Sequence, residues 1–155
     1  MKVLLTGATG YIGKRLLPVL IEQGHHVVCC VRDRSRFNPN KSLLNNISVI
    51  EVDLLDQDSL SKIPKDIDVA YYLVHSMSSA KNYKSLEQKS AINFRESLEE
   101  TSVSQVIYLS GIVNESSLSD HLSSRKAVEL ELEKGKYHFT CLRAGIIIGS
   151  GSASF

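Results

Sequence analysis

The segment Thr6-Gly7-Ala8-Thr9-Gly10-Tyr11-Ile12-Gly13 joins a short apolar run to an amphipathic segment through three spaced glycines. Gly7 permits the tight turn, Gly10 lets the backbone approach a pyrophosphate, and Gly13 lets the helix pack closely on the strand. Unpaired N–H groups at the helix start then face phosphate oxygens. This context predicts a dinucleotide-binding turn, whose candidate residues are Gly7, Thr9, Gly10, Tyr11, Ile12 and Gly13. The alternative is a glycine turn that serves packing alone.

Short β-rich runs alternate with longer helical stretches along the chain, which is typical of a parallel sheet with crossover helices. The expected strands are Lys2–Thr6, His26–Val31, Ser48–Glu51, Val69–Val74, Gln105–Ser110 and Phe139–Ile148. A chain of 155 residues without a linker fits a single domain over residues 1–155. We therefore expect an α/β, doubly wound Rossmann sheet in the order 3-2-1-4-5-6, with its ligand crevice beside strands one and four.

Arginines follow the second expected strand, in the run Val31-Arg32-Asp33-Arg34-Ser35-Arg36. A guanidinium group suits a 2′-phosphate, so the run favours NADP over NAD, with Arg32 as the main contact and Arg34 or Ser35 as helpers. If Asp33 points inward instead, its carboxylate accepts the ribose hydroxyls of NAD. A solvated basic loop is the remaining alternative.

The third expected strand ends beside a carboxylate and an apolar side chain. Asp53 stands where a carboxylate meets an adenine amino group, and Leu54 stands where an apolar side chain covers the ring. Asp53 fits equally well as the cap of a helix that starts near Asp56. Both alternatives stay open at this point.

The composition argues against nucleic acid and membranes as partners of the chain. The 18 Lys and Arg residues nearly balance the 17 Asp and Glu residues, so the net charge of +1 gives no broad field for nucleic acid or an anionic membrane. Cys29, Cys30 and Cys141 make neither a disulfide framework nor a metal site, so we expect reduced thiols and no metal. No apolar stretch reaches the length of a signal peptide core or a membrane span, which predicts a cytoplasmic protein.

The whole chain resembles the extended and atypical short-chain dehydrogenase/reductases, and most of all the NmrA-like and YbjT-like NAD(P)-binding proteins. The resemblance rests on TGATGYIG, VRDR, VDLLD, YLSG and LRAGIIIG, and on His121-Leu122-Ser123-Ser124-Arg125. It implies an NAD(P) cofactor in contact with His75, which follows the fourth expected strand. It also implies a C-terminal substrate portion that this chain lacks, so the substrate and the oligomeric state stay open.

Members of that superfamily use a serine after the fifth strand and a tyrosine four residues before a lysine, and Ser110 matches the serine by position. Placing the last helix by Glu129 puts His121 at the tyrosine position and Arg125 at the lysine position. A shift of one residue restores a lysine, Lys126, but no acid. Arg125 stays protonated and suits a ribose or pyrophosphate, whereas His121 is either an acid or base, or a surface residue.

Three functions therefore stay open for the chain. The first is a non-catalytic or weakly catalytic NAD(P)-binding module such as a redox sensor, which the degenerate Tyr-x-x-x-Lys site favours. The second is an active NAD(P)-dependent reductase or epimerase that uses His121 or Ser110, which the complete glycine turn favours. The third is a structural subunit that keeps the nucleotide as a stabilising ligand.

Overall fold

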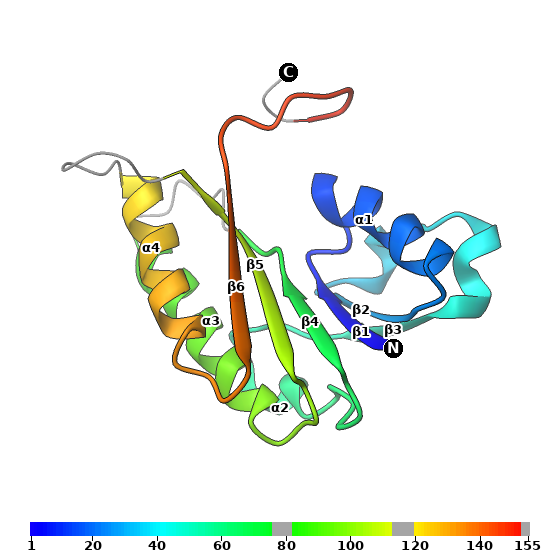
Figure 1. The fold of residues 1–155 in the computed structure, drawn as a ribbon, viewed down its shortest axis with the longest axis horizontal. Helices are drawn as coiled ribbons and strands as arrows, with labels where there is room; N and C mark the ends of the chain where they lie inside the picture. Colours follow the sequence, from blue (N-terminus) through cyan, green and yellow to red (C-terminus); the bar gives the residue numbers. More distant parts are fainter. Residues whose placement is uncertain (76–81, 113–119, 153–155) are drawn as a thin grey trace.

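Six parallel strands form one sheet in the order β3-β2-β1-β4-β5-β6 (Figure 1). The computed structural model describes residues 1–75, 82–112 and 120–152, and for residues 120 and 121 the backbone alone. The strands are β1 Lys2–Thr6, β2 His26–Val31, β3 Ile47–Glu51, β4 Val69–Tyr72, β5 Gln105–Gly111 and β6 His138–Ala144. The expected α/β class and strand order are confirmed.

Helices cover both faces of this sheet. They are α1 Tyr11–Glu22, α2 Gln57–Leu60, α3 Tyr83–Leu98 and α4 Asp120–Leu132, with short 3-10 helices η1 Arg34–Arg36 and η2 Lys41–Asn46. Figure 1 shows α1 on one face and α3 with α4 on the other, because right-handed crossovers change face when the chain returns from β3 to β4. This reversal opens a crevice between β1 and β4. Within the described ranges, no helix is long and apolar enough to cross a membrane.

The central strand β1 is buried on both sides, as its unbroken apolar run predicts. Val3 and Leu5 pack in the core under α1, together with Leu17 of that helix. Leu4 points the other way, into the core under α3 and α4 that contains Phe94. All three β1 side chains have 1% exposure or less, so the strand that leads into the glycine turn is rigidly held.

Two strands are shorter than the sequence predicts. β6 ends at Ala144 and not at Ile148, because its one neighbour β5 ends at Gly111, directly opposite Ala144. β4 ends at Tyr72 and not at Val74. The N–H group of Leu73 donates a hydrogen bond to a side chain, Thr6 Oγ1, at 3.1 Å. β6 therefore ends together with its neighbour, whereas beside β4 the side chain of Thr6 takes the place of a backbone partner.

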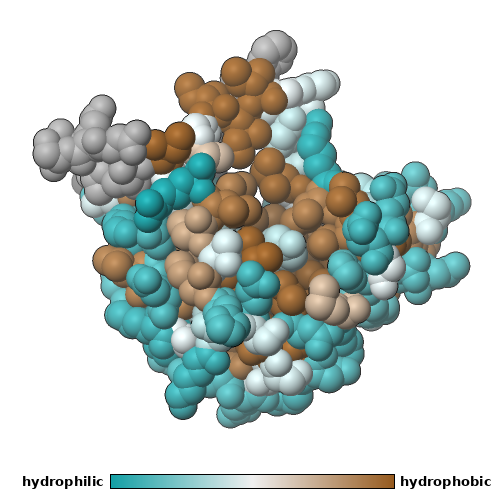
Figure 2. All heavy atoms as spheres, in the orientation of Figure 1, coloured by the Kyte–Doolittle hydropathy of each residue, from teal (hydrophilic) through white to brown (hydrophobic). Residues whose placement is uncertain are grey.

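The segment that follows β6 returns to the start of α1. Arg15 donates a hydrogen bond from Nη2 to the carbonyl oxygen of Ser150 at 2.7 Å, and its guanidinium lies 3.7 Å from the centre of the Tyr11 ring. Figure 2 shows apolar surface over β4–β6 and over this segment. Exposed apolar residues here are Ile112, Leu142, Ile146 and Ile148.

Candidate functional site

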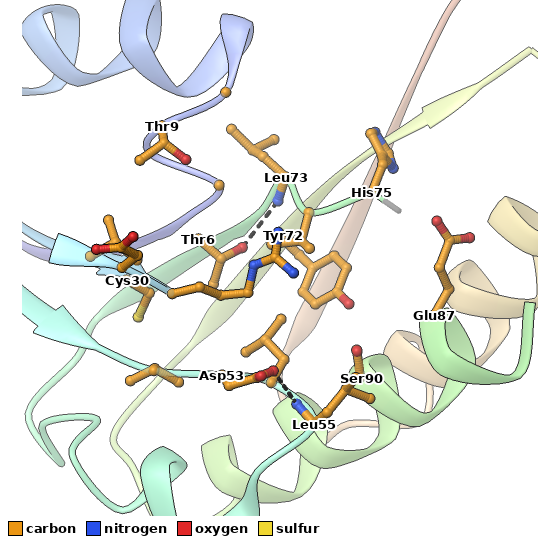
Figure 3. A pocket seen from close by; sticks show the side chains of 18 of the residues that line it. Thr6, Thr9, Cys30, Asp53, Leu55, Tyr72, Leu73, His75, Glu87 and Ser90 are labelled. Atoms are coloured by element: carbon orange, nitrogen blue, oxygen red, sulfur yellow. Dashed lines mark hydrogen bonds between the residues drawn. The ribbon is translucent and has the colours of Figure 1, made fainter. Parts of the chain in front are cut away.

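A cavity of about 660 Å³ opens at the carboxyl ends of β1, β2, β3 and β4 (Figure 3). The segments that follow these four strands line it, and one face of α3 closes it from the side. This is the crevice where the reversal of strand order directs ligands in open α/β sheets. Of the sequence-predicted site residues, the lining includes Gly7, Thr9, Gly10, Arg32, Asp53, Leu54 and His75.

The glycine turn has the close contacts that its sequence predicts. Gly7 has a φ of +71°, and a Cβ there would lie 2.7 Å from the carbonyl oxygen of Leu73. A Cβ on Gly13 would lie 2.2 Å from the carbonyl oxygen of Gly7, so α1 packs directly on the turn. Gly10 is the N-terminal cap of α1 and supplies no side-chain hydrogen bond, which leaves the first N–H groups of the helix to a ligand.

Thr6 fixes the two strands at the crevice. Its hydroxyl donates to the carbonyl oxygen of Tyr71 at 3.0 Å and accepts from the N–H group of Leu73 at 3.1 Å. The side chain is 1% exposed and lines the cavity floor. This bridge between β1 and β4 was not predicted as a site feature, although Thr6 opens the glycine motif.

After β2, Arg32 and Arg36 line the cavity and Arg34 does not. Asp33 also borders the cavity, but its carboxylate accepts hydrogen bonds from the N–H group of Ser35 at 2.9 Å and from the Ser35 hydroxyl at 2.6 Å. These bonds, the hydroxyl one first, lower the pKa of Asp33. Asp33 therefore caps η1, and the two flanking guanidinium groups are the cations at this end of the cavity.

After β3, the cavity is lined by Asp53 and Leu54. They lie in a loop to which a side chain of α3 donates a hydrogen bond. Asp53 accepts a hydrogen bond from the N–H group of Leu55 at 2.9 Å, while the cap of α2 is Asp56. The alternative that Asp53 caps this helix is therefore wrong. The buried amide of Asn93 donates to the carbonyl oxygen of Leu54 at 2.9 Å, which sets the position of the loop.

After β4, His75 faces the cavity as a neutral ring. Burial lowers its pKa to about 4, and the nearby positive charge of Arg125 acts in the same direction. One face of α3 completes this side of the cavity with Leu86, Glu87 and Ser90, none of which was predicted. Their positions follow from the packing of α3 beside β4, which no local motif reveals.

Two of the predicted catalytic residues, Ser110 and Arg125, are not among the residues that line the cavity. Ser110 is 1% exposed, and its hydroxyl has no hydrogen-bond partner among the described residues. Tyr108 donates from its hydroxyl to the carbonyl oxygen of Arg125 at 3.4 Å, which ties α4 to β5. Lys126 points to Glu129, with Nζ 2.7 Å from Oε1. His121 belongs to α4, but its side chain lies outside the described residues.

Of the predicted cofactor contacts in the glycine turn, Tyr11, Ile12 and Gly13 do not line the cavity. Gly13 acts through packing, and Tyr11 lies against Arg15. Cys30 does line the cavity, and burial raises the pKa of its thiol strongly, so the group stays protonated. In the part of the chain that the structure describes, no three His, Cys, Asp or Glu side chains gather as a metal site.

Comparison with known proteins finds a family model that matches most of the chain. Residues 7–149 match the model of a family described as NAD(P)H-binding. Eugenol synthase 2 of Clarkia breweri is 35% identical over 89 residues, which is 54% of this chain and 29% of that protein. An isoflavone reductase homolog, A622-like, of Nicotiana tabacum is 35% identical over 74 residues, which is 44% of this chain and 24% of that protein.

Solved structures share the fold at low sequence identity. Triphenylmethane reductase of Citrobacter sp., complexed with NADP(H), has a TM-score of 0.75 at 18% identity, over 91% of this chain and 48% of that one. UDP-glucuronic acid 4-epimerase of Bacillus cereus, in complex with NAD, has a TM-score of 0.73 at 24% identity, over 92% and 56%. The chain thus spans about half the length of these proteins. The family match confirms the expected resemblance to NAD(P)-binding proteins, and the solved structures show the same fold.

Proposed function

The chain belongs to the NAD(P)H-binding family, and from this premise we propose that its cavity binds NADPH in preference to NADH. The observation that carries the preference is the pair of guanidinium groups, Arg32 and Arg36, at the end of β2. A guanidinium group pairs with a phosphate through two parallel hydrogen bonds, which no group of NADH at this position can match.

Asp33 supports the same preference. A carboxylate that selects NADH must face the ribose with its oxygens available. Ser35 donates both of its hydrogen bonds to one oxygen of Asp33, Oδ1, which holds this oxygen at the start of η1. The negative charge of Asp33 repels a 2′-phosphate. The two positive charges of Arg32 and Arg36 attract it more strongly than this one negative charge repels it.

The rest of the cavity fits the remaining parts of the dinucleotide. The turn at Gly7 and Gly10 leaves N–H groups of α1 to the pyrophosphate. Asp53 and Leu54 border the place for the adenine ring, with a carboxylate for the amino group and an apolar side chain for the ring face. A neutral His75 at the far side neither attracts nor repels the phosphates.

Titration calorimetry with NADPH and NADH tests this proposal. The wild-type chain should bind NADPH more tightly, and Arg32→Ala or Arg36→Ala should weaken NADPH binding about 10- to 100-fold, the usual cost of a charged hydrogen bond. NADH binding should change little. Arg34→Ala is the matched control, because Arg34 lies in the same turn outside the cavity. Equal losses for both cofactors would remove the arginines from the phosphate site.

A catalytic role for the chain rests on α4. When α4 is placed by Glu129, Arg125 falls at the position of the lysine in short-chain dehydrogenase/reductases, and its charge acts on His75 at the cavity edge. A guanidinium group can hold a ribose but cannot release a proton near neutral pH. We therefore propose that Arg125 binds the cofactor. Proton transfer in a reductase or epimerase reaction would then fall to His121 or Ser110. Loss of turnover in His121→Ala with unchanged NADPH affinity would support that assignment, and unchanged turnover would contradict it.

A further inference from the structure

A carboxylate, Glu87, lines the side of the cavity formed by α3. In Figure 3 it lies on the same side as His75, across the cavity from Thr9 and Cys30. The groups suited to the adenosine part, Arg32 and Asp53, follow β2 and β3. With the adenosine part of the ligand near Arg32 and Asp53, the nicotinamide part would occupy the other half of the cavity, next to Glu87.

Glu87 is held in place by the neighbouring helix. Its Oε2 accepts a hydrogen bond from the hydroxyl of Ser124, a residue of α4 that is only 2% exposed. A buried hydroxyl on a packed helix gives the carboxylate a fixed orientation. A carboxylate has about four acceptor sites, and the bond from Ser124 occupies one of them.

The charge of Glu87 decides which ligand group it suits. The cations and N–H groups for phosphate lie at Arg32, Arg36 and the start of α1. A carboxylate close to a phosphate is repelled, whereas a carboxylate close to a hydroxyl accepts a strong hydrogen bond. The adenosine ribose of NADPH keeps one hydroxyl group, beside its 2′-phosphate, and the other two ribose hydroxyl groups belong to the ribose that carries the nicotinamide.

We propose that Glu87, oriented by Ser124, binds the hydroxyl groups of the nicotinamide ribose. This inference rests on the proposed function, since it needs NADPH in the cavity. It gives the chain a ribose contact from α3 in addition to the expected contact from Arg125 on α4. The two helices pack against each other through Ser124, which directly precedes Arg125.

Binding of NADPH and of its two halves tests the inference, with 2′,5′-ADP and reduced nicotinamide mononucleotide as the separate probes. Glu87→Gln keeps the size of the side chain and removes its charge. We expect about tenfold weaker binding of NADPH and of the mononucleotide, and unchanged binding of 2′,5′-ADP. Glu96→Gln is the matched control, because Glu96 lies on α3, pairs with Arg95 and is absent from the cavity lining.

The sign of the change separates the outcomes. Unchanged or tighter NADPH binding by Glu87→Gln would overturn the inference, since it would mean that the carboxylate faces a phosphate or no ligand group. Thermal unfolding without ligand checks that the variant folds. Should it not fold, Ser124→Ala is measured in its place: selective loss of NADPH over 2′,5′-ADP supports the inference, and equal binding contradicts it. A wild-type chain that binds none of the three probes would instead refute the proposed function.

Discussion

Gly13→Ala is the sharpest perturbation of the glycine turn. The new Cβ would lie 2.2 Å from the carbonyl oxygen of Gly7 and 2.9 Å from the Cα of Ala8, where ordinary contacts begin near 3.4 Å. Both neighbours are backbone, so α1 must move away from the turn by roughly 1 Å. Overpacking of this kind costs about 1–3 kcal/mol, which lowers the Tm of a domain this size by roughly 3–10 °C.

Cofactor binding should suffer more than stability in this variant. A shift of roughly 1 Å takes an N–H···O contact beyond hydrogen-bond range, so α1 loses its bonds to the pyrophosphate. We expect about 10- to 100-fold weaker NADPH binding, measured by calorimetry beside thermal unfolding followed by circular dichroism.

Gly24→Ala provides the control for that experiment. Gly24 has a φ of +78° and no atom within 4 Å of the added Cβ, so this variant carries backbone strain of about 1–2 kcal/mol far from the cavity. It should lose stability and keep its NADPH affinity. Wild-type affinity in Gly13→Ala would refute the reasoning, because the turn would then serve packing alone.

Three further variants probe the surroundings of the cavity. His75→Gln should flatten the pH dependence of the unfolding free energy. In the wild-type chain the pKa of His75 is about 4 when folded and near 6.5 when unfolded, so the chain should lose up to about 3 kcal/mol of stability as the pH falls from 6.5 to 4. Parallel curves for the wild type and the variant would count against a neutral His75 ring in the folded chain. Arg143→Ala should lower the unfolding free energy measured in urea, because it removes a 2.7 Å bond to the buried Glu129 and leaves Lys126 as the remaining cation on that carboxylate. Arg143→Lys should recover part of this loss, and equal values for both variants would argue against the ion pair. Asn93→Ala should lower the unfolding free energy by about 1–3 kcal/mol and weaken NADPH binding, because the carbonyl oxygen of Leu54 loses its buried donor. An unchanged NADPH affinity would show that the loop after β3 keeps its position without this hydrogen bond.

Local sequence was enough to predict the parts of the site that lie on one strand–turn–helix unit. Residue types within eight positions predict the strand before Gly7 and the close packing of α1 at Gly13. The structure contains both the strand and the close packing. The strand order followed from the alternation of elements and the right-handed crossover. Strand ends were less predictable, since the end of β6 depends on where its neighbour β5 stops.

Side-chain direction and packing between distant segments could not be predicted. The sequence shows three arginines after β2, but the cap that Asp33 forms with Ser35 leaves Arg36, and not Arg34, at the cavity. Glu87 reaches the same cavity from α3, far along the chain.

Amide chemical-shift changes in a ¹⁵N-labelled chain, recorded by NMR as NADPH is added, show where on the protein the dinucleotide binds. Saturating NADPH should shift the amide signals of residues 7–13, 32–36 and 53–55, the three segments that follow β1, β2 and β3. Signals at the opposite end of the sheet, such as those of Lys65 and Ser104, should stay in place. Shifts confined to that opposite end, or no shifts at all, would contradict a dinucleotide site in this cavity.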